Sequence, residues 1–246
     1  MKKIGSIKNL EVSSLCNLRC PYCPARIQSL HRETGLMTED VFAKSMEWLK
    51  VFVRNGTQKE MNIFGVGEPL LHPNFVSFVA RARNAMPRYL PLIMNTNGTH
   101  MTQELAVQLK NAGIDKIDVT DHEAETAMKA IKAVRRAGIQ CGYSRDAVIN
   151  PNNWGGLIEW TDRVDYERYQ CPWLTDGCVM IMSNGDVTRC CQDGFGRGVL
   201  GTVDDDLPSI SHTPFIQCRK CHENLPPGYD HSDFSSNPKY NSEVEK

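Results

Sequence analysis

The 246-residue sequence has no long apolar run and little imbalance of charge. No stretch approaches the roughly 18 consecutive apolar residues that a membrane helix needs, and the N-terminal Met-Lys-Lys-Ile-Gly lacks the apolar segment of a secretion signal. A formal net charge of -1 disfavours a strong non-specific nucleic-acid surface. We assign the local basic group of Arg81, Arg83 and Arg88 to a solvated helix face. The sequence therefore predicts a cytoplasmic globular protein with no membrane association.

Cysteine, in contrast, is abundant. Ten are present, and in a reducing compartment thiols bind metals more often than they form disulfides. Three lie near the N-terminus at Cys16, Cys20 and Cys23, Cys141 is isolated, and six follow at Cys171, Cys178, Cys190, Cys191, Cys218 and Cys221. This distribution predicts two metal sites, one formed by each group.

Strand and helix patterns alternate over the first 150 residues. Thr38 and Thr102 are each followed by a helical apolar periodicity that they can cap. The sequence Ala-Gly-Ile at 112–114 recurs at 137–139, each time with a glycine where a helix ends and a strand begins. Strands are predicted at 7–13, 61–64, 90–94, 114–120 and 139–144. The fold class is therefore α/β, a partial (β/α)6 TIM-like barrel with reactive groups at the C-terminal strand ends.

The alternation stops after residue 150. The segment Asn152-Asn153-Trp154-Gly155-Gly156 has no strand or helix pattern, and Asn184-Gly185 is typical of a β-hairpin turn. We predict a barrel over 1–150, a linker over 151–170, a smaller cysteine-rich domain over 171–234 and a flexible tail over 235–246.

Cys16, Cys20 and Cys23 follow the first predicted strand with CxxxCxxC spacing. Iron-sulfur clusters are usually held by four cysteines, so three thiolates from one loop leave one iron of a 4Fe-4S cluster open to an external ligand. Taken alone, the same cysteines could hold a structural zinc ion with His31 as the fourth ligand.

The cysteine loop, with Tyr22 before its last cysteine, resembles that of the radical S-adenosylmethionine (SAM) superfamily. Further motifs occur in order at predicted strand ends: Gly65-Val66-Gly67-Glu68-Pro69 is similar to the GGEP motif of the family, Asn95-Thr96-Asn97-Gly98 is similar to its TNG motif, and Val119-Thr120-Asp121-His122 ends the fourth strand. Taken singly, the last two could be a turn and a structural histidine. The resemblance implies that SAM is bound by Gly65, Gly67, Glu68, Asn95, Asn97 and Thr120.

The resemblance also implies a reaction. A reductant of the flavodoxin or ferredoxin type would supply an electron to a 4Fe-4S cluster on Cys16, Cys20 and Cys23. SAM would be cleaved to a 5'-deoxyadenosyl radical, which abstracts a hydrogen atom from the substrate. The protein would position one C-H bond and exclude water.

The C-terminal cysteines resemble those of the SPASM and twitch subfamily. Thirteen residues separate Cys171 from Gly185, four separate Gly185 from Cys190, and Cys218 and Cys221 form a CxxC pair. No cysteine follows Cys221, so the resemblance is to the twitch form with one auxiliary 4Fe-4S cluster on Cys171, Cys190, Cys218 and Cys221. Neighbouring strand residues point to opposite faces, so only one of Cys190 and Cys191 should be a ligand, and the spacing favours Cys190. A four-cysteine zinc site is the alternative.

Among twitch enzymes, the sequence is most similar to the dehydrogenases of 2-deoxystreptamine biosynthesis, which act on an aminocyclitol. This implies oxidation of a polar small molecule with the auxiliary cluster as electron acceptor. Trp154 stands where that family has an arginine, so we take His122 and Arg145 as candidate catalytic residues. The alternatives are an isomerase or epimerase acting on a sugar, peptide or modified nucleotide, with Cys141 or Cys178 returning hydrogen, a peptide maturase, or a non-catalytic metal-binding module.

Overall fold

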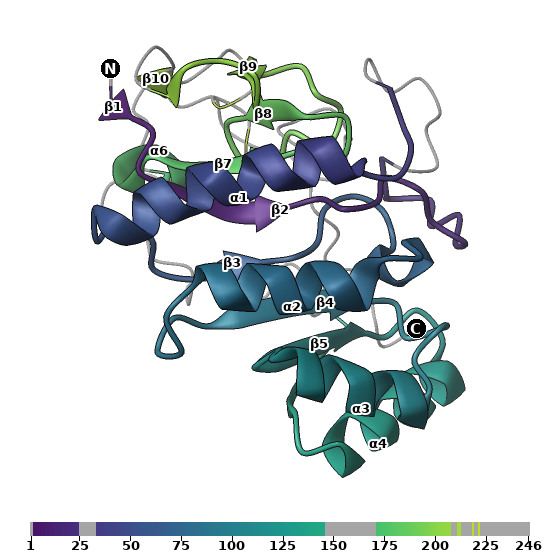
Figure 1. Ribbon diagram of the computed structural model, residues 1–246. Helices are drawn as coiled ribbons and strands as arrows, with labels where there is room; N and C mark the ends of the chain where they lie inside the picture. The colour runs from purple at the N-terminus through teal and green to yellow at the C-terminus, as the bar shows by residue number, and fades with distance from the viewer. Residues whose placement is uncertain are drawn as a thin grey trace, which may run out of the picture.

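The computed structural model describes residues 2–24, 33–145, 171–207, 211–212, 218 and 221. Within these residues, one sheet of eight strands has the order β6-β5-β4-β3-β2-β7-β8-β9. Helices α1 to α4 pack along one face of this sheet (Figure 1). The predicted linker and tail, and the segment around Trp154, lie outside the described residues.

Five neighbouring strands are parallel and follow one another in sequence order, as in a partial barrel. They are β2 (Ser6–Leu10), β3 (Met61–Asn62), β4 (Leu92–Thr96), β5 (Lys116–Thr120) and β6 (Gln140–Ser144). The helices that connect them are α1 (Glu39–Arg54), α2 (Phe75–Ala85), α3 (Gln103–Ala112) and α4 (Ala124–Arg136). The predicted α/β class and alternation are confirmed. Within the described residues no further strand pairs with β6; a sixth parallel strand, β7 (Cys178–Ile181), pairs with β2 instead.

The helix boundaries follow from local sequence. The Thr38 side chain accepts a hydrogen bond from the backbone N–H of Val41, and Thr102 caps α3 through Leu105 in the same way. Gly113 ends α3 in the left-handed conformation, with φ of 96°. Within the described part of the chain, no helix has both the length and the apolar character needed to cross a membrane.

A β-hairpin extends this sheet at the other edge of β2. Strand β7 (Cys178–Ile181) pairs parallel with β2, and β8 (Asp186–Thr188) and β9 (Val199–Thr202) continue antiparallel. The turn between β7 and β8 contains Asn184 and Gly185, as predicted, and Gly185 has φ of 92°. The hairpin shares the barrel core, because Val179, Ile181 and Val187 are fully buried within it.

Four short elements complete the described structure. The helix α6 (Pro172–Asp176) precedes β7, and the 3-10 helix η1 (Pro69–Leu71) follows the loop after β3. Strand β1 (Lys2–Lys3) pairs antiparallel with β10 (Ser211–His212). The C-terminal segment therefore contacts the N-terminal end of the chain as well as β2.

One expectation about the surface is wrong. Arg83 does not lie on a solvated helix face: it is 4% exposed. Its guanidinium lies 2.8 Å from the Asp115 carboxylate and donates to the carbonyls of Pro87 and Leu90. Arg83 thus bridges the end of α2 and the start of β5. Arg81 lies two residues earlier on the same helix, is half-exposed and forms an ion pair with Glu39.

Replacing Arg83 with alanine should lower the free energy of unfolding by about 2 to 3 kcal/mol, because the carboxylate and the carbonyls lose their buried donor. Arg81→Ala is the matched control and should cost less than about 1 kcal/mol, since its ion pair is exposed. Urea unfolding of both variants measures the difference. Equal losses would contradict the structural importance of the Arg83 bridge.

Candidate functional site

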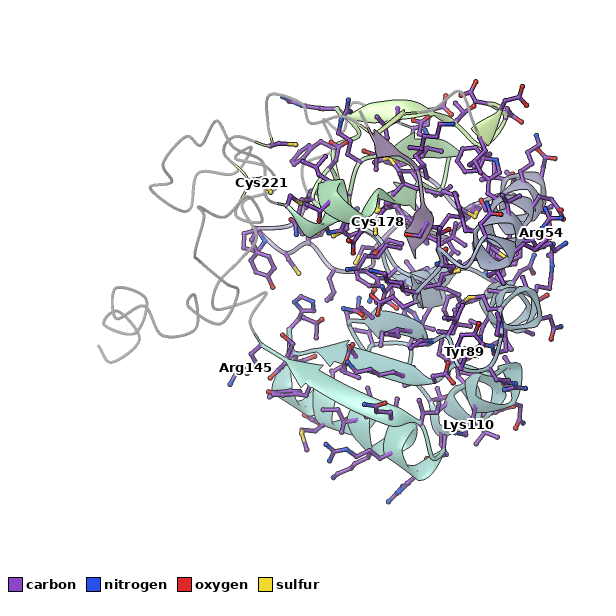
Figure 2. All side chains as sticks on the ribbon, turned by 90° about the vertical axis from the view of Figure 1, so that its left-hand side faces the viewer. Arg54, Tyr89, Lys110, Arg145, Cys178 and Cys221 are labelled. Atoms are coloured by element: carbon purple, nitrogen blue, oxygen red, sulfur yellow. The ribbon has the colours of Figure 1, made fainter. Side chains whose placement is uncertain are left out.

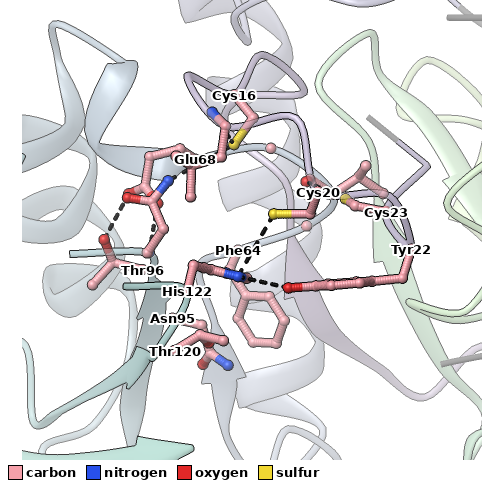
Figure 3. Close-up of a pocket in the computed structure, with 15 residues that line it drawn as sticks. Cys16, Cys20, Tyr22, Cys23, Phe64, Glu68, Asn95, Thr96, Thr120 and His122 are labelled. Atoms are coloured by element: carbon pink, nitrogen blue, oxygen red, sulfur yellow. Dashed lines mark hydrogen bonds between the residues drawn. The ribbon is translucent and has the colours of Figure 1, made fainter. Parts of the chain in front are cut away.

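A pocket lies at the C-terminal ends of the parallel strands, where the sequence motifs meet. Figure 2 shows Arg145 and Cys221 on one side of the molecule and Arg54 and Lys110 on the opposite side. The predicted site residues that line the pocket are Cys16, Cys20, Cys23, Gly65, Gly67, Glu68, Asn95, Asn97, Thr120 and His122. Loops from β2, β3, β4 and β5 therefore contribute to one cavity (Figure 3).

The three N-terminal cysteines surround the pocket and are half-buried. Figure 3 shows the thiols of Cys16 and Cys20 spread along its rim, with Cys23 beyond them. Within the described ranges, no three His, Cys, Asp or Glu side chains form a group that could hold a single metal ion. Burial raises the pKa of Cys16, and the charges of Glu68 and Cys20 contribute. Three soft sulfur ligands on one open pocket are a donor set that fits an iron-sulfur cluster.

Glycine is required at positions 65 and 67, because neighbouring segments approach too closely to leave room for a side chain. A Cβ atom on Gly67 would overlap the backbone of Ser13 to Leu15, at the base of the cysteine loop. A Cβ atom on Gly65 would overlap the side chain of Glu11. The backbone N–H of Glu68 also donates to the carbonyl of Leu15, at 2.8 Å. The loop after β3 is thus packed directly against the loop that carries the cysteines.

The Glu68 carboxylate is buried and joins its own loop to the end of β4. It accepts hydrogen bonds from the backbone N–H of Leu70 at 3.1 Å, the Thr96 hydroxyl at 2.8 Å and the backbone N–H of Asn97 at 2.8 Å. Burial raises the pKa of Glu68, and these three hydrogen bonds oppose that rise. The carboxylate is therefore fixed at the pocket wall between η1 and the end of β4.

Asn97 links the turn after β4 to the cysteine loop. Its amide nitrogen donates to Asn17 Oδ1 at 3.0 Å and lies 3.8 Å from the thiol of Cys16. Its amide oxygen accepts from the hydroxyl of Thr99, which also receives a hydrogen bond from Asn17. Asn95 and Thr120 line the pocket from β4 and β5.

His122 lies inside the pocket with Tyr22. The Tyr22 hydroxyl is 2.8 Å from His122 Nδ1, and the Cys20 thiol is 3.6 Å from the same nitrogen (Figure 3). Burial lowers the pKa of His122, partly opposed by the charge of Asp121. Burial, followed by the hydrogen bond to Cys20, raises the pKa of Tyr22. The imidazole and the phenol are therefore both favoured in their neutral forms.

Arg145 is placed differently from the other candidates. It is not among the described residues that line the pocket, and its side chain is 57% exposed. Its Nε lies 3.2 Å from the carboxylate of Asp121, which is buried and also accepts from the Tyr143 hydroxyl at 2.6 Å. Asp121 thus holds Arg145 next to Tyr143, and Asp121 directly precedes His122 in the chain.

The C-terminal cysteines gather on the hairpin side of the sheet. Burial, followed by the charges of Cys191, Cys221 and Cys171, raises the pKa of Cys190 well above its ordinary value. The N–H of Cys221 donates to the carbonyl of Cys218, at 3.4 Å. The hairpin therefore returns Cys190 towards Cys171, as the sequence predicts.

Cys178 and Cys141 are not predicted ligands, although Cys178 shares a buried cluster with Cys171, Cys190 and Cys191. Cys178 is buried on β7 and accepts a hydrogen bond from the Ser6 hydroxyl at 3.3 Å. Cys141 is half-buried on β6. Neither is among the described residues that line the pocket.

Sequence reasoning missed Glu11, Asn17 and Asp121. Glu11 is a charged residue between Leu10 and Val12, a position that strand alternation assigns to solvent, yet it is fully buried. Asn17 lies inside the cysteine loop, and its partner in Asn97 is 80 residues away. Asp121 directly precedes His122, and this position is the only signal in the sequence that indicates a role for Asp121 at the site.

Comparison with known proteins defines the class. Residues 10–120 match the family model of the Radical SAM superfamily. The chain is 28% identical over 228 residues to the S-adenosyl-L-methionine-dependent 2-deoxy-scyllo-inosamine dehydrogenase of Niallia circulans, covering 89% of this chain and 88% of that protein.

Two solved structures share the fold. BtrN in complex with AdoMet and 2-DOIA has a TM-score of 0.66 at 23% identity, covering 85% of this chain and 86% of that one. Native anSMEcpe with bound AdoMet has a TM-score of 0.55 at 14% identity, covering 88% and 80%. The fold is a partial barrel. The pocket with its three cysteines lies at the C-terminal ends of the strands, where barrel enzymes have their active sites. The chain contains a radical SAM domain at residues 10–120 and is a radical SAM enzyme.

The packing of Gly67 gives a direct test of the site. Gly67→Ala should lower the free energy of unfolding by about 2 to 3 kcal/mol and reduce iron retention, because the added methyl group meets backbone that cannot move aside. Gly35→Ala is the control, since nothing lies within 4 Å of its Cβ position. Thermal unfolding and iron analysis of both variants check this. A Gly67→Ala protein as stable as Gly35→Ala would contradict the close packing of the two loops.

Proposed function

We propose that this radical SAM enzyme is a dehydrogenase that oxidises a polar small molecule of the aminocyclitol class. The observation that carries the proposal is the extent of the similarity to the 2-deoxy-scyllo-inosamine dehydrogenase, which covers 89% of this chain. Coverage of that extent reaches well beyond the radical SAM domain into the segment that contains Cys171 and Cys190. An enzyme that shared only the first half of the chain would share SAM chemistry alone.

The pocket residues divide into two sets in this proposal. Cys16, Cys20 and Cys23 would hold the catalytic 4Fe-4S cluster, and SAM would be held by Gly65, Gly67, Glu68, Asn95, Asn97 and Thr120. When bound, the cluster and SAM supply the radical chemistry that removes a hydrogen atom from an unactivated C-H bond. The fixed Glu68 carboxylate suits a cationic amino group, because its three donors hold it at the wall without neutralising its charge.

The C-terminal cysteines would hold a second 4Fe-4S cluster. Cys171, Cys190, Cys218 and Cys221 are the proposed ligands, and the clustering of Cys190 with Cys171 and Cys221 supports this set. The substrate alcohol would lose a hydrogen atom, then a proton and an electron, and become a ketone. One-electron cleavage of bound SAM, with methionine as the leaving group, would supply the 5'-deoxyadenosyl carbon that takes the hydrogen atom. A cluster on the C-terminal cysteines would supply the electron acceptor, and the proton would go to a base at the pocket.

Two residues are proposed to act on the substrate. His122 lies in the pocket and can exchange a proton through its imidazole. Arg145 stays protonated and would donate to substrate oxygens from the pocket edge, where Asp121 fixes its direction. In this proposal the enzyme works in the cytoplasm, where thiols stay reduced and a flavodoxin- or ferredoxin-type protein can supply electrons.

Metal content separates the two proposed clusters. After anaerobic reconstitution, the full chain should hold about eight irons, and a Cys16→Ala, Cys20→Ala, Cys23→Ala variant should keep about four and lose 5'-deoxyadenosine release with dithionite. Cys190→Ala should also lose about four irons, whereas Cys191→Ala should keep them. Cys141→Ala, far from both ligand sets, is the control and should keep all of its iron.

Other metal contents would contradict the proposal. Tightly bound zinc without SAM cleavage would leave a metal-binding module as the better description. Full iron in Cys190→Ala together with a loss in Cys191→Ala would reverse the ligand assignment. About four irons in the unmodified chain would remove the auxiliary cluster and the electron acceptor with it.

The role of Arg145 can be tested with 2-deoxy-scyllo-inosamine as substrate. Arg145→Met should raise the KM for the substrate about tenfold, since a charge-assisted hydrogen bond is lost, and should leave substrate-free SAM cleavage unchanged. Arg136→Met, an exposed change on α4, is the control. Mass spectrometry of the product reports the reaction class: loss of two hydrogens fits a dehydrogenase, and an unchanged mass would indicate an isomerase. An unchanged KM in Arg145→Met would exclude Arg145 from the substrate site.

A further inference from the structure

Glu11 is a fully buried carboxylate that the proposed chemistry does not use. It directly follows β2 and has 0% exposure. Buried carboxylates are costly unless hydrogen bonds compensate them. Glu11 accepts from the backbone N–H of Val66 at 2.9 Å, and from the backbone N–H and hydroxyl of Ser183, both at 3.3 Å. Oε2 of Glu11 accepts from Val66 and Oε1 accepts from Ser183, so the carboxylate bridges these two residues.

The two partners of Glu11 belong to the two halves of the enzyme. Val66 lies in the Gly65–Glu68 loop, whereas Ser183 lies in the hairpin turn that leads through β8 to Cys190. The Ser183 hydroxyl oxygen also lies 3.2 Å from the hydroxyl oxygen of Ser14. Ser14 in turn receives a hydrogen bond from the N–H of Gly35, at 2.7 Å. A continuous set of buried polar contacts therefore connects the hairpin, the base of the cysteine loop and the Gly65–Glu68 loop.

The Gly65–Glu68 loop also packs on the Glu11 side chain. The Cβ position of Gly65 overlaps the Cβ, Cγ and Oε2 atoms of Glu11, so only glycine allows this approach. Glu11 thus limits the loop by contact at Gly65 and by hydrogen bonding at Val66. Glu11 itself is not among the described residues that line the pocket, so it can affect a bound molecule only through the loop.

We propose that Glu11 is a positioning residue that sets the Gly65–Glu68 loop for SAM binding and couples that loop to the hairpin carrying the C-terminal cysteines. The proposal rests on the proposed assignment of Gly65, Gly67 and Glu68 to SAM. Both oxygens of a carboxylate accept hydrogen bonds, so Glu11 can hold two N–H groups from separate segments at once. An amide at the same position would turn its NH2 group towards one of these donors and displace that segment.

The test compares Glu11→Gln with Asp115→Asn in the reconstituted full chain. Asp115 is a matched control, because its carboxylate also joins two segments, accepting from the N–H of Leu92 and from Arg83, but lies before β5, at the opposite end of the strands from the pocket. Glu11→Gln should weaken SAM binding about tenfold in equilibrium dialysis, with full iron content. It should raise the KM for SAM more than it lowers kcat. Asp115→Asn should leave SAM affinity within about twofold of the unmodified protein.

Ser183→Ala keeps the proposal testable if Glu11→Gln does not fold. It removes one hydroxyl at the hairpin side of the bridge and should weaken SAM binding about threefold. In the double variant the two losses should be less than additive, since both act through one bridge. SAM affinity within twofold of the unmodified chain in the folded variants, at full iron content, would overturn the positioning role.

A separate measurement distinguishes this inference from the proposed function. Gly67→Ala acts on the SAM loop directly, without Glu11. If Gly67→Ala weakens SAM binding and Glu11→Gln does not, the assignment of the loop stands and Glu11 is not a positioning residue. If neither variant alters SAM binding, the loop is not part of the SAM site.

Discussion

The close approach of the Gly65–Glu68 loop to the cysteine loop is the constraint on which the site depends. The backbone of Ser13 to Leu15 leaves no space for a side chain at position 67, and the N–H of Glu68 donates a hydrogen bond to the carbonyl of Leu15. This contact brings three thiols and one buried carboxylate into a single cavity, although β2 and β3 are separated by 50 residues of chain. Parallel strands provide such proximity because their C-terminal ends lie at one edge of the sheet.

Polar side chains then fix the loops to one another. Glu68 accepts hydrogen bonds from the end of β4, and Asn97, after β4, donates a hydrogen bond to Asn17 in the cysteine loop. Buried polar networks are stabilising only when their members are satisfied, and these pairs satisfy each other across separate loops. The site is therefore positioned by mutual hydrogen bonding between strand ends rather than by any single loop conformation.

The hairpin gives the C-terminal cysteines a defined relation to the pocket. Strand β7 pairs parallel with β2, so the strand that leads into the first cysteine loop also carries the second cysteine segment at its other edge. Val179, Ile181 and Val187 place the hairpin in the same apolar core as the barrel helices. A displacement of the hairpin would act on β2 and on Glu11. This shared strand places the C-terminal cysteines and the pocket in one structural unit.

Local features of the sequence determined much of this protein. Thr38 and Thr102 predicted helix starts, Gly113 a helix end, Asn184-Gly185 a hairpin, and the CxxxCxxC spacing a three-thiol site, because each depends on interactions within a few residues. Tertiary structure alone decided that Glu11 and Arg83 are buried, that β7 joins β2, and that Arg145 lies outside the pocket lining. Glu11 depends on Ser183, 172 residues away in the chain, and Arg83 on Asp115, 32 residues away. Strand alternation and helical periodicity describe which face a residue occupies, but not which distant segment covers that face.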